Sequence, residues 1–280
     1  MNNLNKCSVK SVFLLLCVLI GSVASAQEGH RIFTFKPGET YQTEILTNSN
    51  AIVQRGKQTL KVNTVSSVTK SYTNTLANDR GSNFKVKIDK MDTEIEAMGQ
   101  KLRYISTNKI DTSSKIQKAL DFMVNKPVDV QVNQYGLVQS YTDYKAEMAT
   151  DTLVAFAGLQ PEIFEKGIML SFLADFTYNS GLKKNFSWGD SIEIDKQRLV
   201  TRFWIDDVNE KITTLKFSSS ITTKLLNTNQ NGTYIIDNAT GVIQEKIVYS
   251  ISVGYQVSAG GLVYGVSRST SLSEKTKRTR

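Results

Sequence analysis

Residues 243–257 alternate between apolar and polar side chains, and this period of two constrains the fold more than any other feature. The odd-numbered positions are apolar except for Glu245, whereas the even-numbered positions include Gln244, Lys246, Ser250, Ser252 and Gln256. Successive side chains of a β-strand point to opposite faces, so the pattern predicts a strand whose odd-numbered face is buried. At about 3.3 Å per residue the strand would be about 50 Å long, which favours a curved sheet.

Similar alternation predicts strands in both halves of the chain, at residues 41–47, 58–77, 84–98, 101–107, 199–206, 213–223, 232–237 and 262–272. Within 84–98 the apolar phase changes at Asp89 and Lys90, which predicts a β-bulge, because a one-residue slip moves every side chain to the other face. Residues 237–241 (DNATG) predict a hairpin turn, since Asn and Gly tolerate the positive φ angles of tight turns.

Helical patterns cluster in the middle of the chain. The first predicted helix is capped by Thr112 or Ser113 and ends before Pro127. Residues 142–158 form a second predicted helix. Residues 161–178 form a third, which begins with a proline and is apolar on nearly all sides, so it should be buried.

Together these elements predict an α+β protein, in which a large, curved, half-barrel-like antiparallel β-sheet packs against two or three central helices. Residues 128–138 resemble residues 233–243, because each reads as a strand, an Asn or Asp, a Gly and a branched apolar pair. Many hairpin turns read in this way. The alternative is two related halves, 27–145 and 180–275, around the helical segment 112–178.

The first 26 residues have the features of a secretory signal peptide. Lys6 and Lys10 precede a short apolar core, and the small residues that end at Ala26 form the cleavage site. We therefore expect an exported protein with one domain, residues 27–280, located in the periplasm or associated with the envelope. Both cysteines, Cys7 and Cys17, lie in this leader. Because a leucine precedes Cys17, a lipoprotein is not expected, and no transmembrane segment is expected after the leader.

The charge is modestly basic. Formal net charge is +8, and it falls to +6 without the two leader lysines. Four basic residues lie at the C-terminus, namely Lys275, Lys277, Arg278 and Arg280. They are consistent with a frayed, solvated tail or with a contact to anionic lipid or polysaccharide. A nucleic-acid partner is not expected in an exported chain without a basic stripe.

The sequence offers little for catalysis, and we expect a protein that is not an enzyme and has no cofactor. Its single histidine, His30, lies close to the predicted mature N-terminus, and no His or Cys cluster could bind zinc. Carboxylates occur at 92–96 and at 206–210. A calcium site or a glycosidase-like acid pair is one interpretation of these groups, and a solvated strand face with a polar turn is the other.

Aromatic side chains are the remaining candidates for a binding site. A cleft for a lipid or acyl chain between helices and sheet would be lined by Phe164, Phe172, Phe203, Trp204, Tyr249 and Tyr255. Alternatively, helices cover the concave face and the same rings fill a closed core. The pattern of residues does not distinguish a cleft from a core.

Several motifs carry a family resemblance. The leader, residues 125–138 (NKPVDVQVNQYGLV), residues 186–190 (FSWGD) and residues 237–241 together resemble a family of exported bacterial envelope proteins of unknown function. The resemblance covers most of the chain after the leader and implies no catalytic residues. At the level of the fold, long curved strands with helices on one side are similar to periplasmic lipid and lipoprotein carriers.

These observations lead to three functional hypotheses. The preferred one is an exported, non-enzymatic binding protein for an apolar ligand such as a lipid or acyl chain. The alternative is a structural module of the envelope that binds another envelope protein. The third is a hydrolase that uses carboxylates, with Asp206 and Asp207 as its best candidates.

Overall fold

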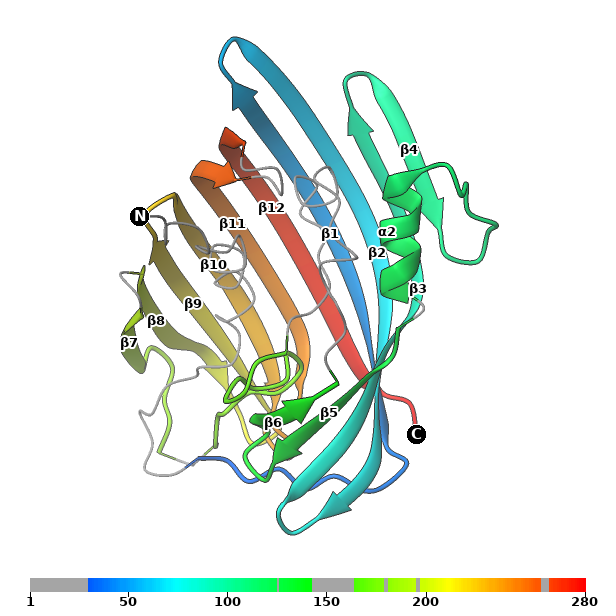
Figure 1. The fold of residues 1–280 in the computed structure, drawn as a ribbon. Helices are drawn as coiled ribbons and strands as arrows, with labels where there is room; N and C mark the ends of the chain where they lie inside the picture. Colours follow the sequence, from blue (N-terminus) through cyan, green and yellow to red (C-terminus); the bar gives the residue numbers. More distant parts are fainter. Residues whose placement is uncertain (1–29, 125, 143–163, 179–180, 195–196, 258–261) are drawn as a thin grey trace, which may run out of the picture.

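The protein folds around one antiparallel β-sheet (Figure 1). The computed structural model describes residues 30–124, 126–142, 164–178, 181–194, 197–257 and 262–280. The strands are β1 (Thr40–Arg55), β2 (Gln58–Asn78), β3 (Gly81–Ala97), β4 (Gln100–Ile105), β5 (Val128–Asn133), β6 (Val138–Tyr141), β7 (Ser187–Ile194), β8 (Gln197–Val208), β9 (Ile212–Thr222), β10 (Leu226–Asp237), β11 (Ile243–Val257) and β12 (Val263–Arg278).

The sheet brings the two ends of the described chain together at its centre. The order is β6-β5-β3-β2-β1-β12-β11-β10-β9-β8-β7, and β4 pairs with β3 beside this path. Long antiparallel pairing between β1 and β12 joins the N-terminal strands to the C-terminal strands. Figure 1 shows that the sheet is curved, with α2 on its concave side. The predicted large curved antiparallel sheet is therefore present, whereas the two related halves stay a prediction.

The prediction of an α+β protein with two or three central helices is wrong, because strands make up nearly all the regular structure described. In that part of the chain, α2 (Lys115–Val124) is the single α-helix. Ser114, rather than Thr112 or Ser113, caps it, and its hydroxyl accepts a 3.2 Å hydrogen bond from the Gln117 N–H. Residues 143–158 of the second predicted helix lie outside the described residues.

The third predicted helix is also wrong over its described part, residues 164–178. This segment runs across the hairpins β5–β6 and β10–β11, with bridges from Met169 to Leu137 and from Leu173 to Val242. Much of its backbone bonds to those hairpins; for example, Ile243 N–H donates to the Phe172 carbonyl over 2.9 Å. The apolar composition reflects burial from several sides, which an irregular segment satisfies as well as a helix when its backbone groups find partners.

Two bulges decide which side chains of β3 and β11 face inward. The bulge predicted near Asp89 is confirmed, because Thr69 pairs with Lys90 while the next residue of β2, Lys70, pairs with Ile88. The bulge at Gln244 of β11 was not predicted. It moves the odd-numbered positions of β11 to the outside of the sheet after Ile243, so the predicted burial of this face is wrong.

The basic C-terminal residues do not form a frayed tail. Lys275, Lys277 and Arg278 belong to β12, which lies between β1 and β11. Their side chains form ion pairs with Glu245, Glu44 and Glu39, respectively. These three basic residues are thus ordered within the sheet and paired with carboxylates, whereas the contact with anionic lipid or polysaccharide stays a prediction.

Candidate functional site

The two faces of the sheet differ, and the inner face is defined as the one on which α2 and residues 164–178 pack. Apolar side chains gather in three clusters on this face. One lies under α2 and includes Leu120 and Met91; the second surrounds Phe172; the third surrounds Phe203 on β8, β9 and β10. In the second cluster the ring of Phe172 lies 4.6 Å from that of Tyr72. These clusters anchor the covering segments to the sheet.

Between the clusters, a continuous row of polar side chains crosses the inner face. Cross-strand pairing connects its members from β8 to β2, and we call this row the polar belt: Thr201, Ser219, Gln230, Ser250, Thr270, Ser49 and Thr64. All are buried except Thr270, which is half-buried. A buried row of this length is unusual, because polar side chains normally face solvent.

Hydrogen bonds between neighbouring strands satisfy part of the polar belt. The hydroxyls of Thr201 and Ser219 lie 3.0 Å apart, and those of Ser49 and Thr270 lie 3.1 Å apart. The Thr64 hydroxyl is buried and has no hydrogen-bond partner among the described residues. An orphaned buried hydroxyl costs about 1–3 kcal/mol, so such groups usually bind water or a ligand.

Charged side chains border the polar belt. Lys246 Nζ lies 3.1 Å from Glu274 Oε1, and the lysine side chain is only 1% exposed. On the neighbouring strand, the Tyr234 hydroxyl is fully buried and likewise finds no hydrogen-bond partner in the described part of the chain. Burial, and to a lesser degree the charge of Glu274, raises the pKa of Tyr234. Arg268 is also buried, and the loss of solvation lowers the pKa of its guanidinium to about 10.

The candidate residues predicted from sequence lie on both faces and do not converge. Phe164 and Phe172 are buried in the second cluster and Phe203 in the third. Trp204 follows Phe203 in β8 and is half-buried on the outer face. Tyr249 and Tyr255 also lie on the outer face and are 55% and 57% exposed.

The sequence analysis missed the polar belt, although its signal is present in the chain. Ser250 and Ser252, at even-numbered positions of β11, lie opposite polar residues of neighbouring strands. For example, the hydroxyls of Ser252 and Thr228 lie 2.8 Å apart. Alternation alone assigns these positions to solvent, because polar residues in an amphipathic strand usually face water. Only the pairing of strands shows that they form one buried row.

Three of the carboxylates considered for catalysis, including Asp206, form ion pairs on strand faces. Asp92 and Glu94 pair with Arg103 and Lys101. Asp206 lies 3.0 Å from Lys216. The side-chain hydrogen bond from Arg103 lowers the pKa of Asp92, so this group is a poor general acid. Within the described ranges, no group of three or more His, Cys, Asp or Glu side chains could hold a metal ion.

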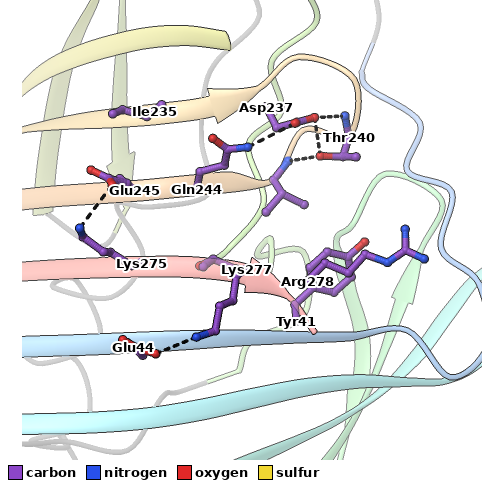
Figure 2. A pocket seen from close by; sticks show the side chains of 12 residues that line it. Tyr41, Glu44, Ile235, Asp237, Thr240, Gln244, Glu245, Lys275, Lys277 and Arg278 are labelled. Atoms are coloured by element: carbon purple, nitrogen blue, oxygen red, sulfur yellow. Dashed lines mark hydrogen bonds and ion pairs between the residues drawn. The ribbon is translucent and has the colours of Figure 1, made fainter. Parts of the chain in front are cut away.

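A groove of about 640 Å³ lies where β10, β11, β12 and β1 end near the hairpin turn of β10 and β11 (Figure 2). Figure 2 shows that its charges face one another: Glu245 pairs with Lys275 and Glu44 pairs with Lys277. Asp237 accepts hydrogen bonds from the turn residue Thr240. These groups satisfy each other, which leaves this groove with few unpaired functional groups for a ligand.

In the described residues, no helix combines the length and the apolar character needed to cross a membrane.

No family model and no curated protein sequence matches this chain. Among solved structures, the chain is similar to a structure of lipovitellin that concerns its lipid–protein interactions, with a TM-score of 0.50 and 11% identity. The similarity covers 87% of this chain and 25% of that one, so this chain spans about a quarter of the lipovitellin chain. An outer-membrane channel from Pseudomonas putida F1 aligns over 90% of this chain and 100% of its own, with 6% identity and a TM-score of 0.29.

The lipovitellin similarity is a likeness of fold alone, and the channel's TM-score is too low to support an argument. A distant fold-level similarity to a protein studied with lipid is thus found, as expected from the long curved strands. Membership in the family of exported envelope proteins stays a prediction.

Proposed function

We propose that this protein is an exported, non-enzymatic binding protein of the cell envelope, and that it binds an amphiphilic lipid or fatty acid on its inner face. The observation that carries the proposal is the division of this face into apolar clusters and a polar belt, with one orphaned hydroxyl, that of Thr64, in the belt and another, that of Tyr234, beside it. An acyl chain would contact the clusters, and the polar head would bond to the belt. This makes the expected ligand, a lipid or acyl chain, more specific, because the polar head now has a binding partner.

The orphaned hydroxyls and the comparison of folds both support this proposal. The Thr64 and Tyr234 hydroxyls are buried without partners among the described residues, so each can bond to a ligand without breaking an existing bond. The similarity in fold is to a part of lipovitellin, whose structure concerns lipid–protein interactions. Binding of this kind needs no catalytic group, so the absence of enzymatic activity forms part of the proposal.

The direct test uses the full chain, expressed with its leader and purified from the envelope. Native mass spectrometry should show a co-purifying lipid, and cis-parinaric acid should bind to delipidated protein. Thr64→Val removes the orphaned hydroxyl at nearly constant volume and should weaken binding severalfold without loss of stability. Thr69→Val is the matched control, because Thr69 lies on the outer face of the same strand, opposite Glu44. Absence of both bound lipid and probe binding would refute the proposal.

A second candidate function, a protein-interaction module of the envelope, is favoured by one observation. The outer face of β11 exposes a line of apolar side chains: Ile247, Tyr249, Ile251, Val253 and Tyr255. Contiguous exposed apolar surface often marks a protein interface. Crosslinking in cells through a photoreactive residue at position 251 would give one dominant protein adduct if this function is correct, and no discrete adduct if it is not.

A further inference from the structure

A second groove, of about 780 Å³, lies on the outer face of β7, β8, β9 and β10, on the opposite side of the sheet from the polar belt. Its lining residues are Asn185, Ser187, Val200, Arg202, Trp204, Ser218, Ser219, Ser220, Asn229, Gln230 and Asn231. This volume is in the range of small-molecule sites. Two of these residues, Ser219 and Gln230, belong to the polar belt on the inner face. The exposed residues of β8, β9 and β10 alternate with them and face the outer side of the sheet, away from the proposed lipid site.

The shape of the groove follows from the sizes of the side chains that lie opposite one another on β8, β9 and β10. Ser218 and Ser220 of β9 pair with Asn231 and Asn229 of β10, and these small side chains form the floor. On β8, Arg202 pairs with Ser218, and the larger side chains of this strand form the wall. Small residues beside bulky neighbours leave an open channel along the strands.

Several polar side chains of the groove form no hydrogen bond or ion pair within the part of the chain that the structure describes. Arg202 forms no ion pair among the described residues, and the side chains of Asn229 and Asn231 form no hydrogen bond there. The lining contains no carboxylate. It therefore combines a full positive charge with two free amides and the hydroxyls of Ser218 and Ser220, and these amides and hydroxyls can both donate and accept hydrogen bonds.

Trp204 supplies the remaining group that selects a ligand. Its indole is half-buried and stands in the wall beside Arg202, two residues away on the same face of β8. The C–H groups of a sugar ring pack against an indole face, and sugar hydroxyls match amides and Ser hydroxyls. A guanidinium binds a carboxylate or sulfate through paired hydrogen bonds.

We propose that this groove binds an acidic glycan, an oligosaccharide that carries carboxylate or sulfate groups. Trp204 would stack on a sugar ring, Arg202 would bind the acidic group, and the Asn and Ser side chains of β9 and β10 would bond to ring hydroxyls. An acidic peptide fits less well, because the floor is polar on both strands and offers no apolar pocket for its side chains.

The test is titration calorimetry of the purified full-length protein with oligomers of alginate and of sulfated dextran, and with maltooligosaccharides and polyglutamate as comparisons. At least one acidic glycan should bind, with an affinity that falls as salt rises. The neutral glycan and the polyglutamate should bind about tenfold more weakly or not at all. Equal binding of polyglutamate would show that charge alone is recognised and would overturn the proposal.

Variants assign the binding to the groove. Arg202→Ala, at an exposed position, should weaken binding about tenfold, and Arg202→Lys should recover only part of it, because the paired geometry is lost. Trp204→Phe should keep more affinity than Trp204→Ala. Arg80→Ala in the β2–β3 turn is the matched control and should change nothing. Lack of binding to either acidic glycan, or binding that Arg202→Ala leaves unchanged, would refute the proposal, whatever the outcome of the lipid experiments.

Discussion

Lys246 of β11 and Glu274 of β12 form an ion pair of 3.1 Å on the inner face of the sheet, almost sealed from water, with side chains 1% and 11% exposed. Each residue is the direct cross-strand partner of the other. A buried pair adds little net stability, because the two charges lose their solvation, but either charge alone would be very unfavourable. This pair therefore constrains the register of the two strands.

Removal of one partner from this pair should destabilise the protein strongly. Glu274→Gln leaves the Lys246 charge buried, and the free energy of unfolding should fall by about 3–5 kcal/mol in urea titrations. The exposed pair of Lys277 and Glu44 serves as the control, and Glu44→Gln should cost less than about 1 kcal/mol. The double variant Lys246→Met with Glu274→Leu should recover most of the loss. If Glu274→Gln lowered the free energy of unfolding no more than the control does, the conclusion that this pair is buried would be contradicted.

The reversed phase of β11 can be tested by thiol labelling. Residues 27–280 contain no cysteine, so single substitutions in this segment report on one position each. Tyr249→Cys should react with a maleimide at nearly the rate of a free thiol, because position 249 is exposed, whereas Ser250→Cys should be strongly protected. The opposite order of labelling rates would show that the odd-numbered face of β11 is buried, as the alternation alone predicts.

Two hairpin-turn glycines should tolerate no side chain. Gly136 has φ 74°, and a Cβ there would lie 2.9 Å from Leu173 Cδ1; Gly241 has φ 75°, and its Cβ would lie 2.8 Å from the ring of Phe33. Either Gly→Ala change should lower the free energy of unfolding by about 2–4 kcal/mol, from backbone strain and overpacking together.

Gly38 provides the matched control for these glycines. It has φ 86°, but no heavy atom lies within 4 Å of the position that a Cβ would take, so Gly38→Ala should show only the backbone cost of about 1–2 kcal/mol. Equal losses at all three positions in chemical denaturation would show that the contacts with Phe33 and Leu173 contribute nothing.

Stability should fall in alkali, with a contribution from Tyr41. Burial, followed by the nearby Glu39 carboxylate, raises the pKa of Tyr41 to about 12, whereas an unfolded tyrosine ionises near pH 10. Between these values the unfolded state releases a proton that the folded state keeps, so the free energy of unfolding decreases as pH rises from about 10 to 12. Tyr41→Phe should flatten this decline in urea titrations, and Tyr249→Phe, on the exposed outer face, is the control. An unchanged slope for Tyr41→Phe would contradict the prediction.

Strands and turns could be predicted in detail because their signals are local. The bulge at Asp89 was visible since apolar residues change phase there, and the turn at 237–241 was visible from its Asn and Gly. Glu245, the polar exception among the odd-numbered positions, was too weak a signal for the bulge at Gln244, because the apolar residues on both sides of it keep the same odd-numbered phase. Only the pairing with β10 shows the extra residue. The helix predicted for residues 164–178 was wrong for another reason, because apolar content indicates burial but does not specify a helix.

For the candidate sites, too, the sequence indicated the local character of the residues but not how they are grouped in space. The sequence indicated that Phe164, Phe172 and Phe203 have apolar surroundings, and it indicated the aromatic character of Trp204. It could not indicate that Ser219 and Ser218, adjacent in the chain, belong to the buried polar belt and to the floor of the outer groove, respectively.

The sequence by itself determined that this chain forms long antiparallel strands with two chemically different faces, because a period of two is a local property of the backbone. The tertiary structure decided which face lies inside and which strands are neighbours. Those choices depend on bulges, on the pairing of β1 with β12 from the far end of the chain, and on the segments that cover the sheet. No local pattern contains that information, since the favourable burial arises only when distant strands meet.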